Sequence, residues 1–208
     1  TLNIAPGEYE ISIFADYIHG VSDQNTITIQ SSTGDSSDVI LKGKSDNSNL
    51  FEFEGVHYLT FQHLTFSNKG RGSYSNVFET NGGMRNFAIR NSHFKADYST
   101  STSSSYSAIQ MYDNYDDIDS IISIENNRFD QYARAIYMVF NNSYRGYDIS
   151  IQGNTLDTTL GGIQVDYGEN VSIIGNEING LDSNTTATRD LIRMTSCYGE
   201  VIITDNRI

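Results

Sequence analysis

Four short segments of the sequence alternate aliphatic residues with polar side chains that could contact a polysaccharide. They are AIQMYD (108–113), AIYMVF (135–140), GIQVDY (162–167) and LIRMTS (191–196). In an extended strand, successive side chains point to opposite faces, so the partners of the inward aliphatic residues share an outward face. We therefore expect an outward strip that includes Gln110, Tyr112, Tyr137, Gln164, Asp166 and Arg193.

This strip has residue types that suit carbohydrate chemistry. Tyr rings stack on the CH faces of sugars, and Gln, Asp and Arg bond sugar hydroxyls, so all six residues are candidate ligands of a glycan. Proton abstraction beside a uronate carboxylate needs a cation to neutralise that carboxylate, and a base. Only Tyr137, Asp166 and Arg193 form a central group for these roles. We expect them to be catalytic only if they converge in a groove walled by the turns at 112–120 and 140–147, and otherwise expect no catalytic residue.

A second kind of site to consider is a metal site. The turn DNYDDID (113–119) could offer oxygen ligands to Ca²⁺ from Asp113, Asp116, Asp117 and Asp119. It lacks the ligand spacing of a calcium loop, and the histidines form no zinc triad. We therefore expect no metal centre and keep Ca²⁺ only as a candidate cofactor.

Composition excludes several classes of function. The 26 acidic residues outnumber the 13 basic ones, and the net charge of −13 argues against a nucleic-acid partner, which would select a basic surface. No apolar run approaches the roughly 18 residues of a membrane helix, so we expect no membrane insertion. The single cysteine excludes an internal disulfide.

A repeated phrase organises the chain and positions the strip. Ile124, Ile151, Ile173 and Ile203 are each followed three residues later by Asn127, Asn154, Asn176 and Asn206. Phe129, Leu156, Ile178 and Ile208 follow after two further residues. The Asn residues are 27, 22 and 30 positions apart, and variable spacing around a constant phrase is typical of a solenoid. Helical periodicity is absent, so we expect an all-β fold of about seven rungs that forms one domain, 1–208.

The phrase also predicts details of each rung. We expect the repeated Asn to form a corner, to adopt the left-handed backbone conformation, and to bond the Asn of the next rung in a ladder. Phe66, Phe94 and Phe129 share one position and should stack inside the rod. In SNVFETNGG (75–83), either Val77 with Glu79 or Phe78 with Thr80 faces inward. The second register avoids burying a carboxylate.

The pattern resembles the right-handed parallel β-helix of the pectin-lyase-like superfamily along essentially the whole chain. APGEY (5–9), NTITIQSSTGDSSDVILKG (25–43) and HYLTFQHLTFSN (57–68) are similar to the opening rungs of two groups. One is the alginate lyase and chondroitinase B family, and the other is a class of β-helix modules in large secreted bacterial surface proteins. TIQSSTGDSSDVIL resembles the second group more closely. The Lys and Arg pair that the lyase resemblance implies has no counterpart in the strip, and the clustered Asp residues of a hydrolase are also missing.

The sequence therefore predicts an extracellular or bacterial cell-surface module with a structural or adhesive role, and polysaccharide as its candidate ligand. We expect it to be a segment of a longer protein whose flanking rungs continue the rod. The alternative is a polysaccharide lyase or glycoside hydrolase that acts on an acidic polysaccharide. A fold of this kind carries many functions and does not choose between the two.

Overall fold

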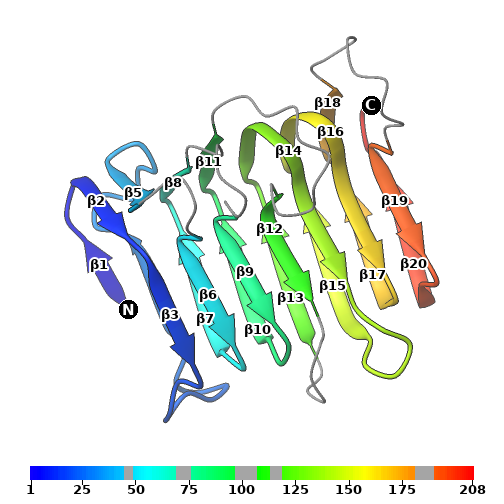
Figure 1. Ribbon diagram of the computed structural model, residues 1–208, viewed down its shortest axis with the longest axis horizontal. Coiled ribbons are helices and arrows are strands. Elements are labelled where there is room, and N and C mark those ends of the chain that lie inside the picture. Colours follow the sequence, from blue (N-terminus) through cyan, green and yellow to red (C-terminus); the bar gives the residue numbers. More distant parts are fainter. Residues whose placement is uncertain (45–48, 69–75, 97–106, 113–118, 181–189) are drawn as a thin grey trace.

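Alternation of apolar and polar residues produces β-strands throughout the chain. The computed structural model describes residues 1–44, 49–68, 76–96, 107–112, 119–180 and 190–208. These described residues form strands and turns, and their strands pair in parallel with strands one rung away (Figure 1). The part of the chain that the structure describes has no helix long and apolar enough to cross a membrane. The expected all-β parallel β-helix is confirmed.

Three faces surround the core. The first face contains β1 (Leu2–Ile4), β4 (Ile27–Ser31), β7 (His57–Gln62), β10 (Arg85–Arg90), β13 (Ser120–Glu125), β15 (Gly146–Gln152), β17 (Gly168–Ile174) and β20 (Tyr198–Thr204). The second face contains β2 (Gly7–Ile11), β5 (Val39–Gly43), β8 (Thr65–Asn68), β11 (His93–Ala96) and β18 (Glu177–Gly180). The third face contains β3 (Ile13–Asp16), β6 (Phe51–Glu54), β9 (Phe78–Asn81), β12 (Ser107–Tyr112) and β19 (Ile192–Thr195).

Two long strands join the second face to the third. β14 (Arg128–Val139) and β16 (Thr155–Asp166) pair with second-face strands through their first residues and with third-face strands through their last. Their mutual register shifts between Asp130 and Arg134, where the chain bends from one face to the next. Such irregularities bend a strand, so these two rungs pass from face to face within one strand.

Aromatic and aliphatic side chains fill the rod in columns. Phe94 lies in register with Phe66 and Phe129, and its ring centroid is 4.9 Å from the first ring and 4.5 Å from the second. The expected stack is therefore confirmed. Phe78 and Thr80 are fully buried while Glu79 is not. The prediction that Phe78 and Thr80 face inward is therefore also confirmed. Burial of each such ring contributes about 1.5–3 kcal/mol.

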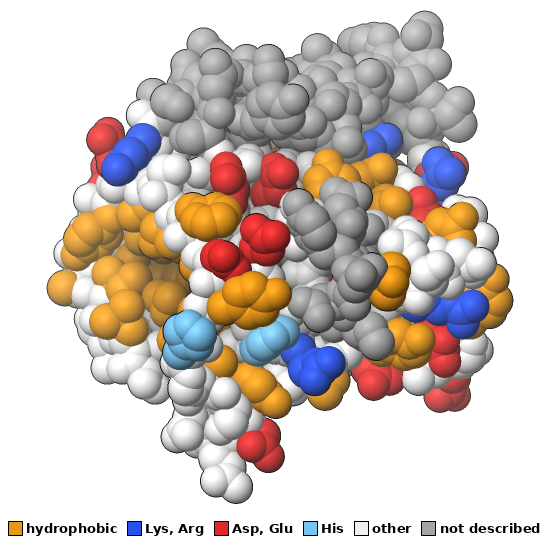
Figure 2. All heavy atoms as spheres, turned by 60° about the horizontal axis from the view of Figure 1, so that its bottom comes forward, with side chains coloured by type: hydrophobic (Ala, Val, Ile, Leu, Met, Phe, Trp, Pro, Cys, Tyr) orange, Lys and Arg blue, Asp and Glu red, His pale blue; other side chains and the backbone are white. Residues whose placement is uncertain are grey.

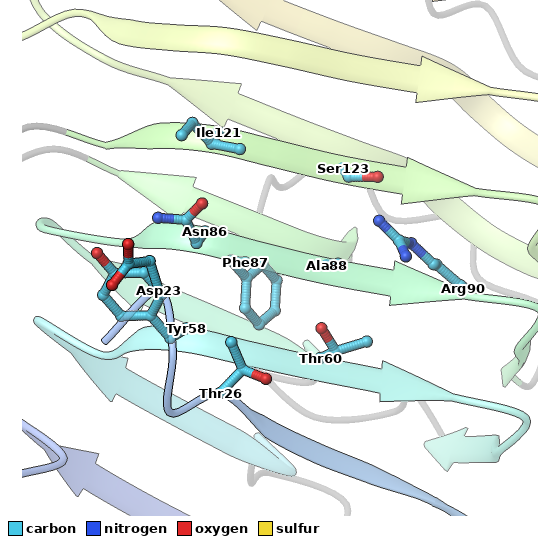
Figure 3. A pocket seen from close by; sticks show the side chains of 10 residues that line it. All are labelled: Asp23, Thr26, Tyr58, Thr60, Asn86, Phe87, Ala88, Arg90, Ile121 and Ser123. Atoms are coloured by element: carbon cyan, nitrogen blue, oxygen red, sulfur yellow. The ribbon is translucent and has the colours of Figure 1, made fainter. Parts of the chain in front are cut away.

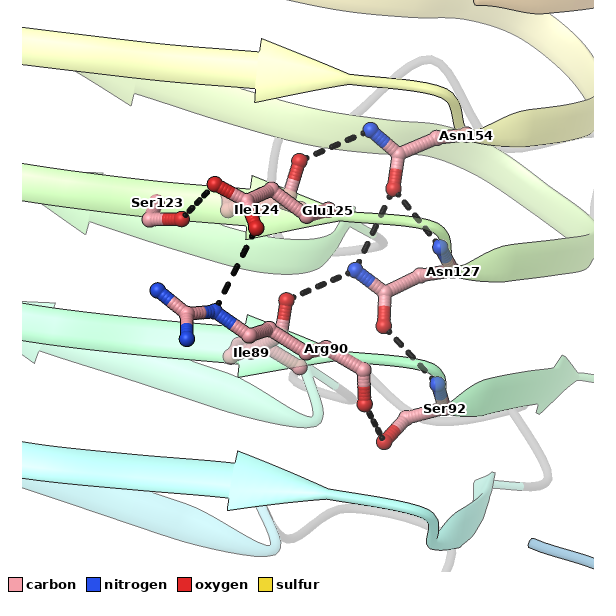
Figure 4. Close-up of polar contacts among 8 residues, drawn as sticks. All are labelled: Ile89, Arg90, Ser92, Ser123, Ile124, Glu125, Asn127 and Asn154. Carbon is pink, nitrogen blue, oxygen red and sulfur yellow. Dashed lines mark hydrogen bonds and ion pairs between the residues drawn. The ribbon is translucent and has the colours of Figure 1, made fainter.

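The corner between the first and second faces contains the expected Asn ladder (Figure 4). The Nδ2 of Asn127 donates to Ile89 O at 2.9 Å, and the Nδ2 of Asn154 donates to Ile124 O at 2.9 Å. The Oδ1 of each Asn accepts the backbone N–H of the residue one rung earlier, as from Asn127 to Asn154 at 2.9 Å. Asn176 and Asn206 continue this pattern.

We expected the ladder Asn itself to adopt the left-handed backbone conformation, and this prediction is wrong by one residue. The left-handed residue precedes the ladder position, as at Asn126 (φ 54°), Gly153 (φ 62°), Gly175 (φ 63°) and Asp205 (φ 57°). The physical reason is that the direction of the chain must change before the ladder position. The following Asn can then point its amide into the corner and meet the rungs on both sides.

Candidate functional site

The outward strip forms two adjacent columns on the third face. Gln110, Tyr137, Gln164 and Arg193 are successive neighbours across β12, β14, β16 and β19. Tyr112, Val139, Asp166 and Thr195 form the second column on the same strands. The intervening Ile109, Met111, Ile136, Met138, Ile163 and Val165 are buried, as their alternation predicts.

Gln110 differs from the expected outward ligand. It is fully buried, and its Oε1 accepts a hydrogen bond from Asn76 Nδ2 at 2.6 Å. A side chain held in this way cannot bond a ligand at the surface, so this candidate is corrected. Tyr112 and Tyr137 are half-buried and meet edge to face with their ring centroids 6.4 Å apart.

The three candidate catalytic residues contact other neighbours. Asp166 Oδ2 accepts from Gln164 Nε2 at 2.7 Å, and Arg193 Nε donates to Thr195 Oγ1 at 3.5 Å. Tyr137 lies under the guanidinium of Arg134, 5.1 Å from the ring centroid. Arg193 is two rungs from Tyr137, which is about 10 Å at the strand spacing of a sheet.

One small depression is found beside these residues in the part of the chain that the structure describes. A depression of about 10 Å³ beside Gln164 is lined by Arg134, Gly161 and Asp190, and by none of the three candidate catalytic residues. The turn at 140–147 is described, whereas most of the turn at 112–120 lies outside the described residues. Among the described residues, the three candidate catalytic side chains thus contact other neighbours and not one another.

The acidic turn is described only at its end. Asp113, Asp116 and Asp117 lie outside the described residues. Asp119 is 1% exposed, and its Oδ1 accepts the backbone N–H of Met84 at 2.6 Å. This bond joins two rungs, so Asp119 has a structural role. Within the described ranges, no group of three or more His, Cys, Asp and Glu side chains could hold a metal ion.

Sequence reasoning missed a second amide row at the corner between the second and third faces. Asn49 Oδ1 accepts from Asn76 N at 3.0 Å, and Asn76 Oδ1 accepts from Ser107 N at 3.1 Å. Asn49 Nδ2 also donates to Glu79 Oε2 at 2.6 Å. The signal was present, because Asn49 and Asn76 are separated by 27 residues, as are Asn127 and Asn154.

Carboxylates gather at the N-terminal end of the third face. Glu52 lies opposite Glu79 on the neighbouring strand, and Glu54 lies opposite Asp16 in the same way. Figure 2 shows acidic side chains in one group beside hydrophobic side chains and two histidines. The group adds to the negative charge of the chain and opposes the approach of an anionic glycan to this face.

A charged cluster on the second face was also missed. His93 Nε2 lies 2.6 Å from Asp130 Oδ2, and Arg128 Nε donates to Asp130 Oδ1 at 2.8 Å. Arg128 also reaches Asp157 at 3.5 Å, and Lys95 lines the adjoining hollow of about 390 Å³. Burial lowers the pKa of His93 and outweighs the opposing effect of Asp130. His93 and Arg128 occupy equivalent positions on neighbouring strands, and so do Lys95 and Asp130. The register between rungs is what brings the charged groups together.

Comparison of the chain with protein-family models, with curated proteins and with solved structures found no match.

Proposed function

We propose that the chain is a non-catalytic module of an extracellular or bacterial cell-surface protein, and that it acts as a stalk or adhesive segment with glycan as its ligand. The observation that carries this proposal is the pairing on the third-face strip. Asp166 bonds Gln164, Arg193 bonds Thr195, and Tyr137 lies against Arg134. Groups held by neighbours along a flat sheet suit lateral contacts with a ligand better than proton transfer.

The fold supports a structural role. Each rung bonds the rungs before and after it through parallel strands, and the Asn ladder adds buried hydrogen bonds at the corner. A rod of this kind is stabilised by neighbour contacts, and further rungs at either edge would extend it without changing its architecture. Flanking rungs of a longer chain are therefore part of the proposal.

The first test combines activity and binding. The chain is incubated with alginate, pectate and chondroitin sulfate, with Ca²⁺ and with chelator, and the absorbance of unsaturated sugar products is followed. We expect no increase under any condition. Binding of the same polysaccharides is then measured by affinity electrophoresis. We expect Tyr137→Ala to weaken it, and Val139→Ala, the matched control on the same strand, to leave it unchanged. A rising absorbance that Arg193→Ala abolishes would refute the non-catalytic role.

A polysaccharide lyase for acidic glycans is the second candidate, and one observation favours it. Arg128 lines two hollows on the second face, one together with Lys95 and the other together with His93, so a base and cations could meet a uronate there. The same absorbance assay tests this alternative with His93→Gln. Product formation lost in His93→Gln but retained in Arg193→Ala would place a lyase site on the second face.

A further inference from the structure

A hollow on the outer side of the first face lies apart from every site considered above. It has a volume of about 260 Å³ and extends over β7, β10 and β13 (Figure 3). Its floor is made by Thr60, Ala88 and Ser123, which are neighbours in register on the three strands. Small side chains in three successive rungs leave the surface depressed at this point.

One edge of the hollow combines two apolar side chains with an unusual backbone. Tyr58 and Ile121 both line the hollow and both have φ of 56°. Ile121 is 50% exposed. A β-branched residue in the left-handed region is strained, and such strain persists where the surrounding structure or a function maintains it.

The neighbouring rungs show that the fold does not require apolar side chains at this position. The same left-handed conformation occurs at Asn86 (φ 53°), Asp148 (φ 54°) and Asn170 (φ 56°) on the first face. Asn and Asp adopt this conformation at lower energy than Ile or Tyr. The backbone alone therefore favours Asn at positions 58 and 121, and the half-buried Tyr58 and the exposed Ile121 call for another explanation.

Polar groups complete the lining. Asp23 and Asn86 lie near Tyr58, and Arg90 lies toward the opposite end of the hollow (Figure 3). Arg90 is held by an ion pair from its Nε to Glu125 at 3.3 Å, and Glu125 also accepts from Ser123 (Figure 4). The guanidinium is thus positioned beside the hollow with its charge balanced by Glu125.

We propose that this hollow binds a pyranose unit of a neutral glycan. Tyr58 and Ile121 contact the apolar face of the sugar ring, and Asp23, Asn86 and Arg90 bond its hydroxyls. A site with an aromatic side chain and a few convergent polar groups has the chemistry that recognises a sugar. The net charge of −13 and the pairing of Arg90 with Glu125 favour a neutral glycan over a polyanion.

The same face supplies an internal control. A hollow of about 270 Å³ over β15, β17 and β20 has Ser150 and Ser172 among its lining residues. Asp148 and Asn170 occupy its left-handed positions, in place of Tyr58 and Ile121. It therefore resembles the first hollow in size and backbone but not in apolar contact surface, so we do not expect it to bind the sugar.

Affinity electrophoresis in gels that contain galactomannan, xylan, mixed-linkage β-glucan, pectate or alginate tests the proposal. We expect retardation by at least one neutral polysaccharide, and at least a tenfold weaker interaction for Tyr58→Asn and Ile121→Asn. The matched substitution Asp148→Asn, in the second hollow, should leave retardation unchanged.

Equilibrium unfolding of the same variants separates loss of the site from loss of the fold. Because Asn suits the left-handed conformation, Ile121→Asn should unfold at the same denaturant concentration as the parent chain or at a higher one. Retardation only in the gels that contain pectate or alginate overturns the proposal, and so does the absence of retardation in every gel. The proposal is also overturned by full retention in both Asn variants, or by unfolding of Ile121→Asn at a lower denaturant concentration.

Discussion

Replacement of Asn154 by Ala is expected to remove the central link of the buried ladder. Its Nδ2 donates to Ile124 O at 2.9 Å, and its Oδ1 accepts the backbone N–H of Asn127 at 2.9 Å. Asn154 is 1% exposed, so water has no ready access to the groups that lose their partner. The substitution therefore leaves the buried N–H of Asn127 without its partner and removes the side-chain hydrogen bond to Ile124 O, a carbonyl that also lies in the ladder between β13 and β15.

The expected magnitude follows from these two groups. A buried polar group left without a partner costs about 1–3 kcal/mol, and the lost hydrogen bond to Ile124 O adds about 0.5–1.5 kcal/mol. We expect the free energy of unfolding to fall by about 2–4 kcal/mol. Since single domains are stable by about 5–15 kcal/mol, this would be a large fraction of the total.

Urea unfolding followed by circular dichroism measures the loss, with an unchanged dependence on urea as the sign that the folded state is retained. Asn179→Ala is the matched control, because Asn179 is exposed and makes one surface bond of 3.0 Å to Asp157. Its effect should stay within about 0.5 kcal/mol. A loss below about 1 kcal/mol for Asn154→Ala, or equal losses for both variants, would refute the ladder argument.

Three further predictions follow from the core, a close contact and a titrating group. Phe94→Ala should lower the free energy of unfolding by about 3–5 kcal/mol in denaturant titrations, because the ring lies between Phe66 and Phe129. Phe14→Ala should have little effect, since Phe14 is 66% exposed. Gly162→Ala should be destabilising by about 1–3 kcal/mol in the same titrations, because its Cβ would lie 2.6 Å from Leu191 O; a neutral result would contradict this close contact. For His93, a folded pKa below the ordinary 6.5 means that neutral imidazole stabilises the fold. That contribution is present above pH 6.5 and lost as pH falls below it, so melting temperatures of the parent chain and His93→Gln should converge from pH 7.5 to pH 5; a constant difference would count against it.

The local pattern carries much of the fold. The alternation around Ile109 and Met111 predicts a strand with one buried side, and the structure confirms it. The recurrence of Ile, Asn and an apolar residue at fixed offsets predicts the corner, its ladder and the column of Phe66, Phe94 and Phe129. These features depend on residues close in sequence or on an identical phrase one rung away, so a single sequence contains them.

The candidate sites depend on information that the pattern lacks. Gln110 has the outward position that alternation predicts, yet Asn76, 34 residues away, holds its amide in a buried row. His93 meets Asp130 across 37 residues. Turns of different lengths separate successive rungs, so the sequence does not show which polar side chains become neighbours.

The sequence by itself determined that this chain is a stack of strands with an inward apolar side and an Asn corner, because strand alternation and the repeated phrase are local properties. The tertiary structure alone decided which outward residues meet. Tyr58, Asn86 and Ile121 come from three rungs and share one hollow because parallel pairing brings β7, β10 and β13 into register. Hydrogen bonds between rungs fix that register, and any chemistry on the surface of the rod follows from it.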